Sequence, residues 1–348
     1  MLTPSDERLP ILRFDSSTAP TREAFDLWHD QMALIFDVEV IDHDNDHGFH
    51  GVLETFHLGS LLLGRCESVT QRFTRPPRLI GHSGLDHYLI QFIERGGSGG
   101  RMGGREMQAH AGDVTIIDLA QPTTTIDSDF STLTLCIPRE VLAPLMSSPD
   151  ALHGVVLPAA SPTGSLLGTH IQSLYKAANS LSARDAMAVA RGSAAFVAGC
   201  LGPALDALDL VLPAMRTNRL NSIKRYIEDN LANPELDAAL IAQAAGLSRP
   251  TLYRLFEPMG GVAAYVLQRR LSRAVADLMN PNERRRIVDI AHHWGFSSET
   301  AFSRAFRTAF GLSPRDARNA RGQPRAGQPQ GADPADEFKR WFRTLAAL

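Results

Sequence analysis

The feature that most constrains this 348-residue chain is an internal repeat toward its C-terminal end. The two copies start at Ile241 and Ile290. In each, Ile-Ala is followed by a glycine five residues after the isoleucine, then by an apolar residue and a serine. Both copies end in an Arg-x-Phe segment. A repeated unit of this size indicates one supersecondary structure used twice.

Each copy has the features of two short helices joined by a tight turn. The glycine permits the left-handed geometry of a helix C-terminus, and the following serine offers a hydroxyl to cap the next helix. The apolar side chains expected to face inward from that second helix are Leu252, Leu255, Phe256, Phe302 and Phe306. Its outer face is polar, as in a helix-turn-helix whose second helix enters the DNA major groove.

The segment between the two copies, Gly261–Met279, is long enough for one continuous helix. Such a helix would fix the distance between two DNA-reading helices. We therefore expect an all-α C-terminal domain of two helix-turn-helix units joined by a long helix.

The charge distribution supports a polyanionic partner for this region. The net charge of the whole chain is −3, but residues 1–214 carry −11 and residues 215–322 carry +7. An acidic part joined to a basic part is expected when one domain meets nucleic acid and the other does not.

The N-terminal half predicts an antiparallel β domain. Short runs rich in β-branched and aromatic residues alternate with glycine clusters, which favours a sandwich or barrel. The expected strands are Gly51–Phe56, Ser60–Cys66, His87–Glu94, Arg105–His110, Asp113–Asp118 and Thr132–Ile137, preceded by a helix over Ala24–Val38. The run Gly96–Gly100 is expected to form a flexible hairpin tip. The fold class of the chain is thus α+β.

Two helical segments and a tail complete the expected organisation. Residues 165–181 and 183–201 predict helices that pack closely, either on the barrel or in a dimer interface. Phe338, Trp341, Phe342 and Leu345 share one face of a C-terminal helix, which we expect to pack on this protein or a second copy. The expected parts are an arm (1–20), a sensing domain (21–164), a helical pair (165–212), a DNA-binding domain (213–319), a linker (320–334) and a terminal helix (335–348).

Residues 220–318 resemble the DNA-binding domain of AraC/XylS-type transcription regulators. The second repeat carries the sharpest likeness, from Ile290-Ala291 through Gly295-Phe296-Ser297-Ser298 to Phe310-Gly311-Leu312-Ser313-Pro314. The N-terminal half is similar to the cupin-like sensor domains of that family, over His87–Glu94, Gly103–Met107 and Gly112–Asp118. The resemblance implies a cupin-like β-barrel that binds a small-molecule effector or dimerises. It also favours activation through contact with RNA polymerase on double-stranded promoter DNA, with repression as the alternative. The composition of the helical pair over residues 165–201 leads us to expect a homodimer.

Matching positions give the expected DNA-contacting residues. They are Arg249, Pro250, Thr251, Tyr253, Arg254, Ser298, Glu299, Thr300, Ala301, Ser303, Arg304 and Arg307. Arginine can fork to guanine or grip phosphate, glutamate can accept from a cytosine amino group, and threonine or alanine can touch a thymine methyl. Pairing with an acid inside the fold is the alternative for Arg254 and Arg304. Arg269, Arg270, Arg273 and Arg284–Arg286 are expected to be solvated or near phosphate.

Three other motifs resemble catalytic or metal sites but do not fit them fully. Gly96–Gly100 matches the Gly-x-Ser-x-Gly nucleophile elbow, but no helix is expected after it. Asp42–Gly48 resembles the start of an EF-hand loop with the glycine one place late. His82, His87 and His110 lie in the sensing half without the His-x-His pair of a cupin metal site. We therefore expect no metal, no cofactor and no enzymatic activity.

Two alternative functions remain at this stage. One is a cupin-type metal enzyme fused to a DNA-binding module, and the other is a DNA binder that needs no effector. Cys66, Cys136 and Cys200 are far apart, and neither a secretion signal nor a membrane span is evident. We therefore expect a cytoplasmic location.

Overall fold

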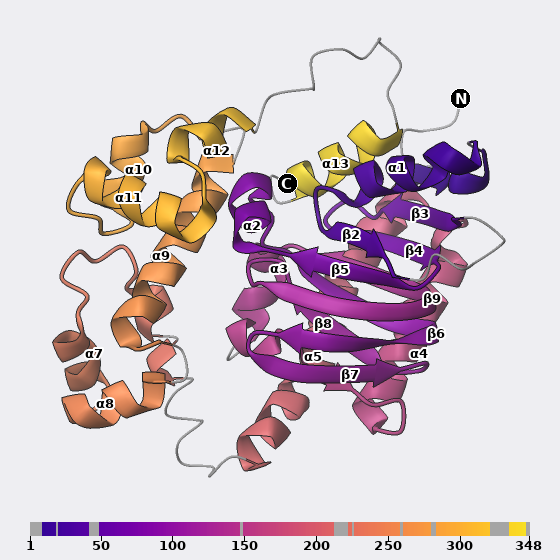
Figure 1. Cartoon of the computed structure of the whole chain (residues 1–348). Coiled ribbons are helices and arrows are strands. Elements are labelled where there is room, and N and C mark those ends of the chain that lie inside the picture. Colours follow the sequence, from indigo (N-terminus) through magenta and orange to yellow (C-terminus); the bar gives the residue numbers. More distant parts are fainter. Residues whose placement is uncertain are drawn as a thin grey trace. The chain divides into compact units, whose positions relative to one another are not determined.

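The computed structural model divides the chain into two compact units. It describes residues 9–18, 20–41, 49–146, 149–211, 222–224, 226–257, 260–279, 283–320 and 334–345. Unit 1 comprises residues 1–76, 85–204 and 328–348, and unit 2 comprises residues 77–84 and 205–327 (Figure 1). The start of the expected arm, the EF-hand-like loop, the basic junction after Pro213 and most of the expected linker lie outside the described residues.

Unit 1 is built on one antiparallel sheet, to which the described residues contribute ten strands. Their bounds are β1 Ile11–Asp15, β2 Asp37–Val40, β3 Gly51–His57, β4 Leu62–Ser68, β5 Gln71–Arg75, β6 Tyr88–Met102, β7 Arg105–His110, β8 Val114–Asp118, β9 Thr123–Ile137 and β10 Val156–Leu157. The main path is β1-β3-β4-β9-β6-β8-β10, while β2 pairs with β5, β5 with β9, and β7 with β6.

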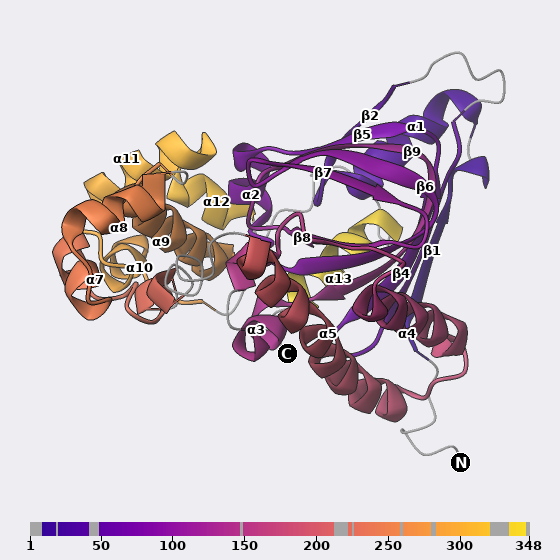
Figure 2. The ribbon, with the colours of Figure 1, turned by 90° about the horizontal axis from the view of Figure 1, so that it is seen from below.

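The 15-residue strands β6 and β9 are the long strands through which the sheet curves into a barrel. The first part of β6 pairs with β8 and its last part with β7. The first part of β9 pairs with β5 and the remainder with β4. Irregular register between Ile93 and Gly97 interrupts the β6–β9 pairing, and such bulges bend strands. The two long strands therefore belong to both walls of the barrel (Figure 2).

The expected hairpin tip at Gly96–Gly100 is wrong, because these residues lie inside β6. A Cβ on Gly100 would lie 2.2 Å from the carbonyl oxygen of Thr124, so β9 approaches too closely for a side chain. The β6–β7 turn falls instead at Gly103 and Gly104, which have φ values of 55° and 80°. The glycine cluster thus serves a close strand contact and not a turn.

Helices cover the sheet of unit 1. They are α1 Thr21–Met32, α3 Arg139–Leu142, α4 Pro162–Ala178, α5 Ala183–Val211 and α13 Pro334–Thr344, with short 3-10 segments at Ser16–Thr18, Ala143–Leu145 and Pro149–Leu152. The helix expected over Ala24–Val38 ends at Met32, and Asp37–Val40 forms strand β2 instead. The apolar residues between them, Leu34–Phe36, are buried in the core of the unit although they are not helical. Their apolar character therefore reflects burial and not a continuation of the helix.

Unit 2 is helical and has two adjoining cores. Its helices are α2 Pro77–Ser83, α7 Ala238–Ala244, α8 Arg249–Phe256, α9 Val262–Met279, α10 Ile287–His293, α11 Glu299–Phe310 and α12 Pro314–Ala320. Residues 222–224 and 226–229 are also helical. One core gathers α7, α8 and the start of α9. The other gathers the end of α9 with α10, α11 and α12.

Helix α2 was not expected, and it belongs to unit 2 although it lies between β5 and β6 in the sequence. Ile80 is buried in the core formed around α11. A Cβ on Gly81 would lie 2.4 Å from Cβ of Phe310, so glycine is required for this approach. The second helix-turn-helix therefore completes its core with a segment distant in sequence.

Candidate nucleic-acid interface and effector cavity

Both repeats form the expected helix-turn-helix. Gly246 and Gly295 take φ values of 61° and 72° at the ends of α7 and α10, which fits the left-handed turn expected there. Ser298 caps α11, because its hydroxyl accepts a hydrogen bond of 3.2 Å from the backbone N–H of Ala301. Ser248 makes no such bond to the backbone of α8, and its hydroxyl lies 2.9 Å from the hydroxyl of Thr251.

The apolar faces of α8 and α11 point inward as expected. Leu252, Phe256, Phe302 and Phe306 are fully buried, and Leu255 is partly buried. The opposite faces are left at the surface. Exposed there are Arg249, Pro250, Tyr253, Arg254, Ser298, Glu299, Thr300, Ala301, Arg304 and Arg307, while Thr251 and Ser303 are partly exposed.

The outer face of α11 is hollowed into a shallow groove. Its lining residues are Glu299, Thr300, Ser303, Arg304, Arg307 and Thr308. The structure therefore brings together five of the expected residues and adds Thr308. Thr308 could have been found from the sequence, because it follows Arg304 by four positions and so shares its helix face. Ser298 and Ala301 do not line the groove, and the expected residues of α8 lie on a separate helix.

The arginines on these outer faces take no part in holding the fold together. Within the described part of the chain, Arg249, Arg254, Arg304 and Arg307 form neither an ion pair nor a side-chain hydrogen bond. Desolvated arginines are normally paired, so unpaired ones at the surface are available to an anionic partner.

The arginines of α9 behave differently, and the expectation that they are solvated or near phosphate is wrong for most of them. Arg269 is buried and donates to Glu228 at 2.5 Å, and Arg273 donates to the same carboxylate at 3.0 Å. Beyond α9, Arg285 pairs with Asp277 at 2.9 Å. These side chains hold the helices of unit 2 together.

Arg270 links the two helix-turn-helix units. Its guanidinium donates to the carbonyl oxygens of Leu231 at 3.0 Å and Asn233 at 2.6 Å, and to that of Gly295 at 3.1 Å. Trp294 packs against both cores, and its indole N–H donates to Asp277 at 2.7 Å. Within unit 2, helix α9 runs from the first helix-turn-helix to the second (Figure 1). Helices α8 and α11 are therefore held on one scaffold.

Unit 1 contains a cavity of about 80 Å³ inside the barrel. It is lined by alternate residues of several strands, among them Leu53 and Thr55 of β3, Leu62, Gly64 and Cys66 of β4, and Thr132, Thr134 and Cys136 of β9. Since side chains alternate across a strand, these positions share the inner face. Five phenylalanines complete the wall, namely Phe36, Phe73, Phe130, Phe338 and Phe342.

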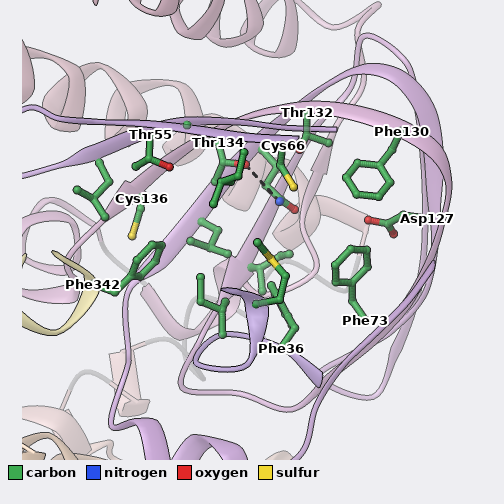
Figure 3. Close-up of a pocket in the computed structure, with 18 of the residues that line it drawn as sticks. Phe36, Thr55, Cys66, Phe73, Asp127, Phe130, Thr132, Thr134, Cys136 and Phe342 are labelled. Carbon is green, nitrogen blue, oxygen red and sulfur yellow. Dashed lines mark hydrogen bonds between the residues drawn. The ribbon is translucent and has the colours of Figure 1, made fainter. Parts of the chain in front are cut away.

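The polar groups of the cavity are few (Figure 3). Gln91 donates to the hydroxyl of Thr134 at 3.3 Å, and Asp127 accepts from the hydroxyl of Ser98 at 2.6 Å. Burial raises the pKa of Asp127 to about 6, against the hydrogen bonds from Ser98 and Thr125 that lower it. An apolar cavity with few placed polar groups is typical of a small-molecule site.

Comparison with known families decides the identity. An AraC-binding-like domain matches residues 28–202, which is half of the chain, and a helix-turn-helix domain matches residues 241–320. The chain belongs to the AraC family of transcription regulators. It is a DNA-binding regulator whose cupin-like N-terminal domain is of the effector-sensing type.

Individual relatives agree with this assignment to the AraC family. Transcriptional activator NphR of Rhodococcus sp is 27% identical over 263 residues, covering 74% of this chain and 77% of that protein. Transcriptional activator RhrA of Rhizobium meliloti is 35% identical over 102 residues, covering 29% of this chain and 32% of that protein. The crystal structure of the AraC-like transcriptional activator CuxR has a similar fold, with a TM-score of 0.53 at 24% identity over 77% of this chain and 96% of that one.

The remaining motifs do not add a site to this AraC-family chain. Gly96–Gly100 lies in a paired strand, so the strand-turn-helix of a nucleophile elbow is not formed there. His87 is buried, whereas His82 and His110 are exposed. Across the described ranges, no group of three His, Cys, Asp or Glu side chains is placed to hold a metal ion. No helix in those ranges is long and apolar enough to cross a bilayer.

Proposed function

We propose that this AraC-family regulator binds double-stranded promoter DNA through the outer faces of α8 and α11. The contacting residues would be Arg249, Pro250, Thr251, Tyr253 and Arg254 on α8, and Ser298, Glu299, Thr300, Ala301, Ser303, Arg304 and Arg307 on α11. The observation that carries this is a contrast between arginines. Those on the outer faces form no ion pair or side-chain hydrogen bond among the described residues, while those of α9 are used inside the fold.

Each face offers chemistry suited to a base edge. Arg304 and Arg307 stand one helical turn apart in the groove of α11, with Glu299 and Thr300 at its N-terminal end. Arginine can make two hydrogen bonds to guanine, and glutamate can accept from cytosine. Tyr253 is 52% exposed on α8 although its ring is apolar, which favours contact with a partner. We infer that both helices read sequence and that their arginines also grip phosphate.

The barrel cavity is proposed as the effector site. Its lining is mainly apolar, and all lining residues except Phe338 and Phe342 lie within residues 28–202, which match the AraC-binding-like model. The effector-independent alternative gains no support from such a cavity. The proposal assigns the protein no catalytic activity.

We further propose a homodimer formed through α4 and α5. Leu166 of α4 is 57% exposed, and Met187 and Phe196 of α5 are 53% and 38% exposed. Large apolar side chains left exposed on these two helices favour burial against a second copy. Light scattering on the full chain tests this, because Phe196→Glu should give monomers while wild type gives dimers.

The direction of regulation is proposed from the relatives. Both NphR and RhrA are named transcriptional activators. We therefore propose that this protein activates transcription in the cytoplasm through contact with RNA polymerase. A promoter–reporter fusion should lose expression when the gene for this protein is deleted.

Gel-shift titration on the DNA upstream of neighbouring genes tests the DNA interface. Arg304→Ala should weaken binding by about 1–3 kcal/mol if Arg304 reads a base. Arg101→Ala is the control, because Arg101 is exposed on β6 in unit 1 and lies outside both proposed interfaces. Wild-type binding should weaken steeply with salt as phosphate contacts release counterions. Equal affinity of wild type and Arg304→Ala at fixed salt would remove Arg304 from the interface.

A further inference from the structure

Helix α2 supports the second helix-turn-helix, although strands of the barrel flank it in the sequence. It lies between β5 and β6, yet it belongs to unit 2. The helix-turn-helix model matches residues 241–320, so α2 stands outside the stretch that forms the DNA-binding module. The support that α2 gives is therefore an addition to the two repeats.

The contact between α2 and α11 is made at the C-terminal end of α11. Phe310 is the last residue of this helix, and a Cβ on Gly81 would lie 2.4 Å from Cβ and 2.6 Å from Cγ of Phe310. Ile80 is 5% exposed and belongs to the same apolar core as Phe306 and Phe310. Because such close packing leaves little room for movement, α2 restricts where the end of α11 can lie.

The position of this end matters for the exposed side of α11. Arg307 stands three residues before Phe310, and Arg304 stands six residues before it. Since an α-helix of this length is stiff, a tilt at Phe310 changes the direction in which both guanidinium groups point. A helix-turn-helix reads base edges with its second helix set in the major groove, and those hydrogen bonds need a defined geometry. Packing at Phe310 therefore bears on how well the opposite face can contact DNA.

The joints between α2 and the strands on either side of it are short. Pro76 is the single residue between the end of β5 and the start of α2 at Pro77, and proline restricts the backbone there. At the other end, the backbone N–H of Gly84 donates to the carbonyl oxygen of Ile80 at 3.0 Å, and Gly84 takes a φ of 68°. This left-handed turn closes α2 directly before unit 1 resumes at Leu85.

Arg75 ties the two ends of the α2 segment together from within unit 1. Its fully buried side chain donates to the carbonyl oxygens of Leu85 at 3.1 Å, Leu119 at 2.7 Å and Ile35 at 2.6 Å. Arg75 precedes α2 and Leu85 follows it, so the first of these bonds spans the base of the helix. Hydrogen bonds from a charged donor are stronger than neutral ones. The barrel itself therefore holds both ends of α2.

We propose that α2 is a positioning element that the barrel contributes to the second helix-turn-helix, and that Ile80 and Gly81 hold α11 in the orientation that binds DNA. This rests on the proposed DNA-binding function of α11. When α2 packs less well, α11 samples other orientations, and the apparent affinity falls with the fraction of molecules in the competent one. The apolar core around α8 includes no residue of α2 among those described. The effect is therefore selective for α11.

Footprinting of the full chain on the DNA upstream of neighbouring genes separates the two helices. Arg254→Ala and Arg304→Ala first assign the part of the protected site that belongs to α8 and the part that belongs to α11. Ile80→Ala should raise the protein concentration needed to protect the α11 part about tenfold, with a smaller change in the α8 part. Ile80→Val removes one methyl group and should show a smaller loss of the same kind. Leu252→Ala is the matched control, because Leu252 is fully buried in the core around α8, and it should give the reverse pattern.

Two further variants test the close approach and the joint to the barrel. Gly81→Ala should give the same pattern as Ile80→Ala, because its Cβ has no room against Phe310. Pro76→Gly loosens the joint to β5 from outside the core around α11, and it should weaken protection of the α11 part about two- to fivefold.

Circular dichroism identifies the variants that fold, and if Ile80→Ala does not fold, the pattern in Ile80→Val decides. Folded variants of Ile80 and Gly81 that leave the α11 part unchanged, or that weaken both parts equally, refute the positioning role of α2. Wild-type protection in Pro76→Gly refutes the contribution of the barrel. A wild-type chain that protects no DNA instead refutes the proposed function, and the role of α2 with it.

Discussion

The guanidinium of Arg270 donates a hydrogen bond of 3.1 Å to the carbonyl oxygen of Gly295, the turn glycine of the second helix-turn-helix. The same side chain donates to Asn233 and Leu231, which precede the first. Hydrogen bonds from a charged donor contribute about 1.5–3 kcal/mol each. Arg270 therefore supports the geometry between the two DNA-reading helices as well as the stability of unit 2.

Arg270→Ala should lower the free energy of unfolding of unit 2 by about 2–4 kcal/mol, because three carbonyl oxygens lose their partner. Chemical denaturation followed by circular dichroism measures this. Arg254→Ala is the matched control, since Arg254 is an exposed arginine without a partner in the described structure. It should leave stability unchanged while weakening DNA binding. Equal stability of Arg270→Ala and wild type would contradict the linking role of Arg270.

Ser298→Ala should destabilise unit 2 by about 0.5–2 kcal/mol, because the N-terminal backbone of α11 loses its cap. Ser248→Ala should cost less, since Ser248 makes no side-chain bond to the backbone of α8. Urea denaturation of both variants gives the comparison. A larger loss in Ser248→Ala than in Ser298→Ala would show that the caps are not as described.

The stability of unit 1 should depend on pH through Asp127. Its pKa is raised from 3.8 to about 6 in the folded state, so the folded protein binds this proton more tightly than the unfolded chain. The stabilisation is present below pH 3.8 and is lost as pH rises through 6. From pH 5 to pH 7.5, Asp127→Asn should therefore gain about 1 kcal/mol relative to wild type. A difference between the two proteins that is the same at both pH values would refute this.

Arg139 and Asp118 form a buried ion pair, and Arg139 also donates to the hydroxyl of Tyr88 at 2.6 Å and to Asp150 at 3.1 Å. Arg139→Met should destabilise unit 1 by about 3–5 kcal/mol, because it leaves the Asp118 carboxylate buried without its partner. Adding Asp118→Asn should restore part of the loss. Additive effects of the two substitutions in thermal unfolding would show that the pair is not coupled.

The DNA-binding unit was predictable because its signals are local. The turn glycines, the apolar stripe and the polar outer face all lie within about 20 residues of one another, and α8 carries the expected contact residues within Arg249–Phe256. Arg269 and Arg270 were misjudged because their partners lie about 40 residues earlier in the chain. Helix α2 was missed for the same reason, since its packing partner Phe310 is about 230 residues away.

The barrel was predictable in class but not in detail. Strands β1, β2 and β5 were missed because they are short and carry charged residues, which stand at alternate positions in β1 and β2. The glycines of β6 indicate a turn from sequence alone, and only the close approach of β9 explains them. Predicting the cavity would have required knowing which strand faces point inward and where α13 docks. A local sequence pattern indicates neither.

The division of the chain has a practical consequence for dissecting the protein. The backbone passes between the two units four times, at residues 76–77, 84–85, 204–205 and 327–328. One protease cut after α5 would therefore not liberate the DNA-binding half, which stays tethered through its other end and through α2. Limited proteolysis should yield fragments that co-migrate under native conditions and separate only in denaturant.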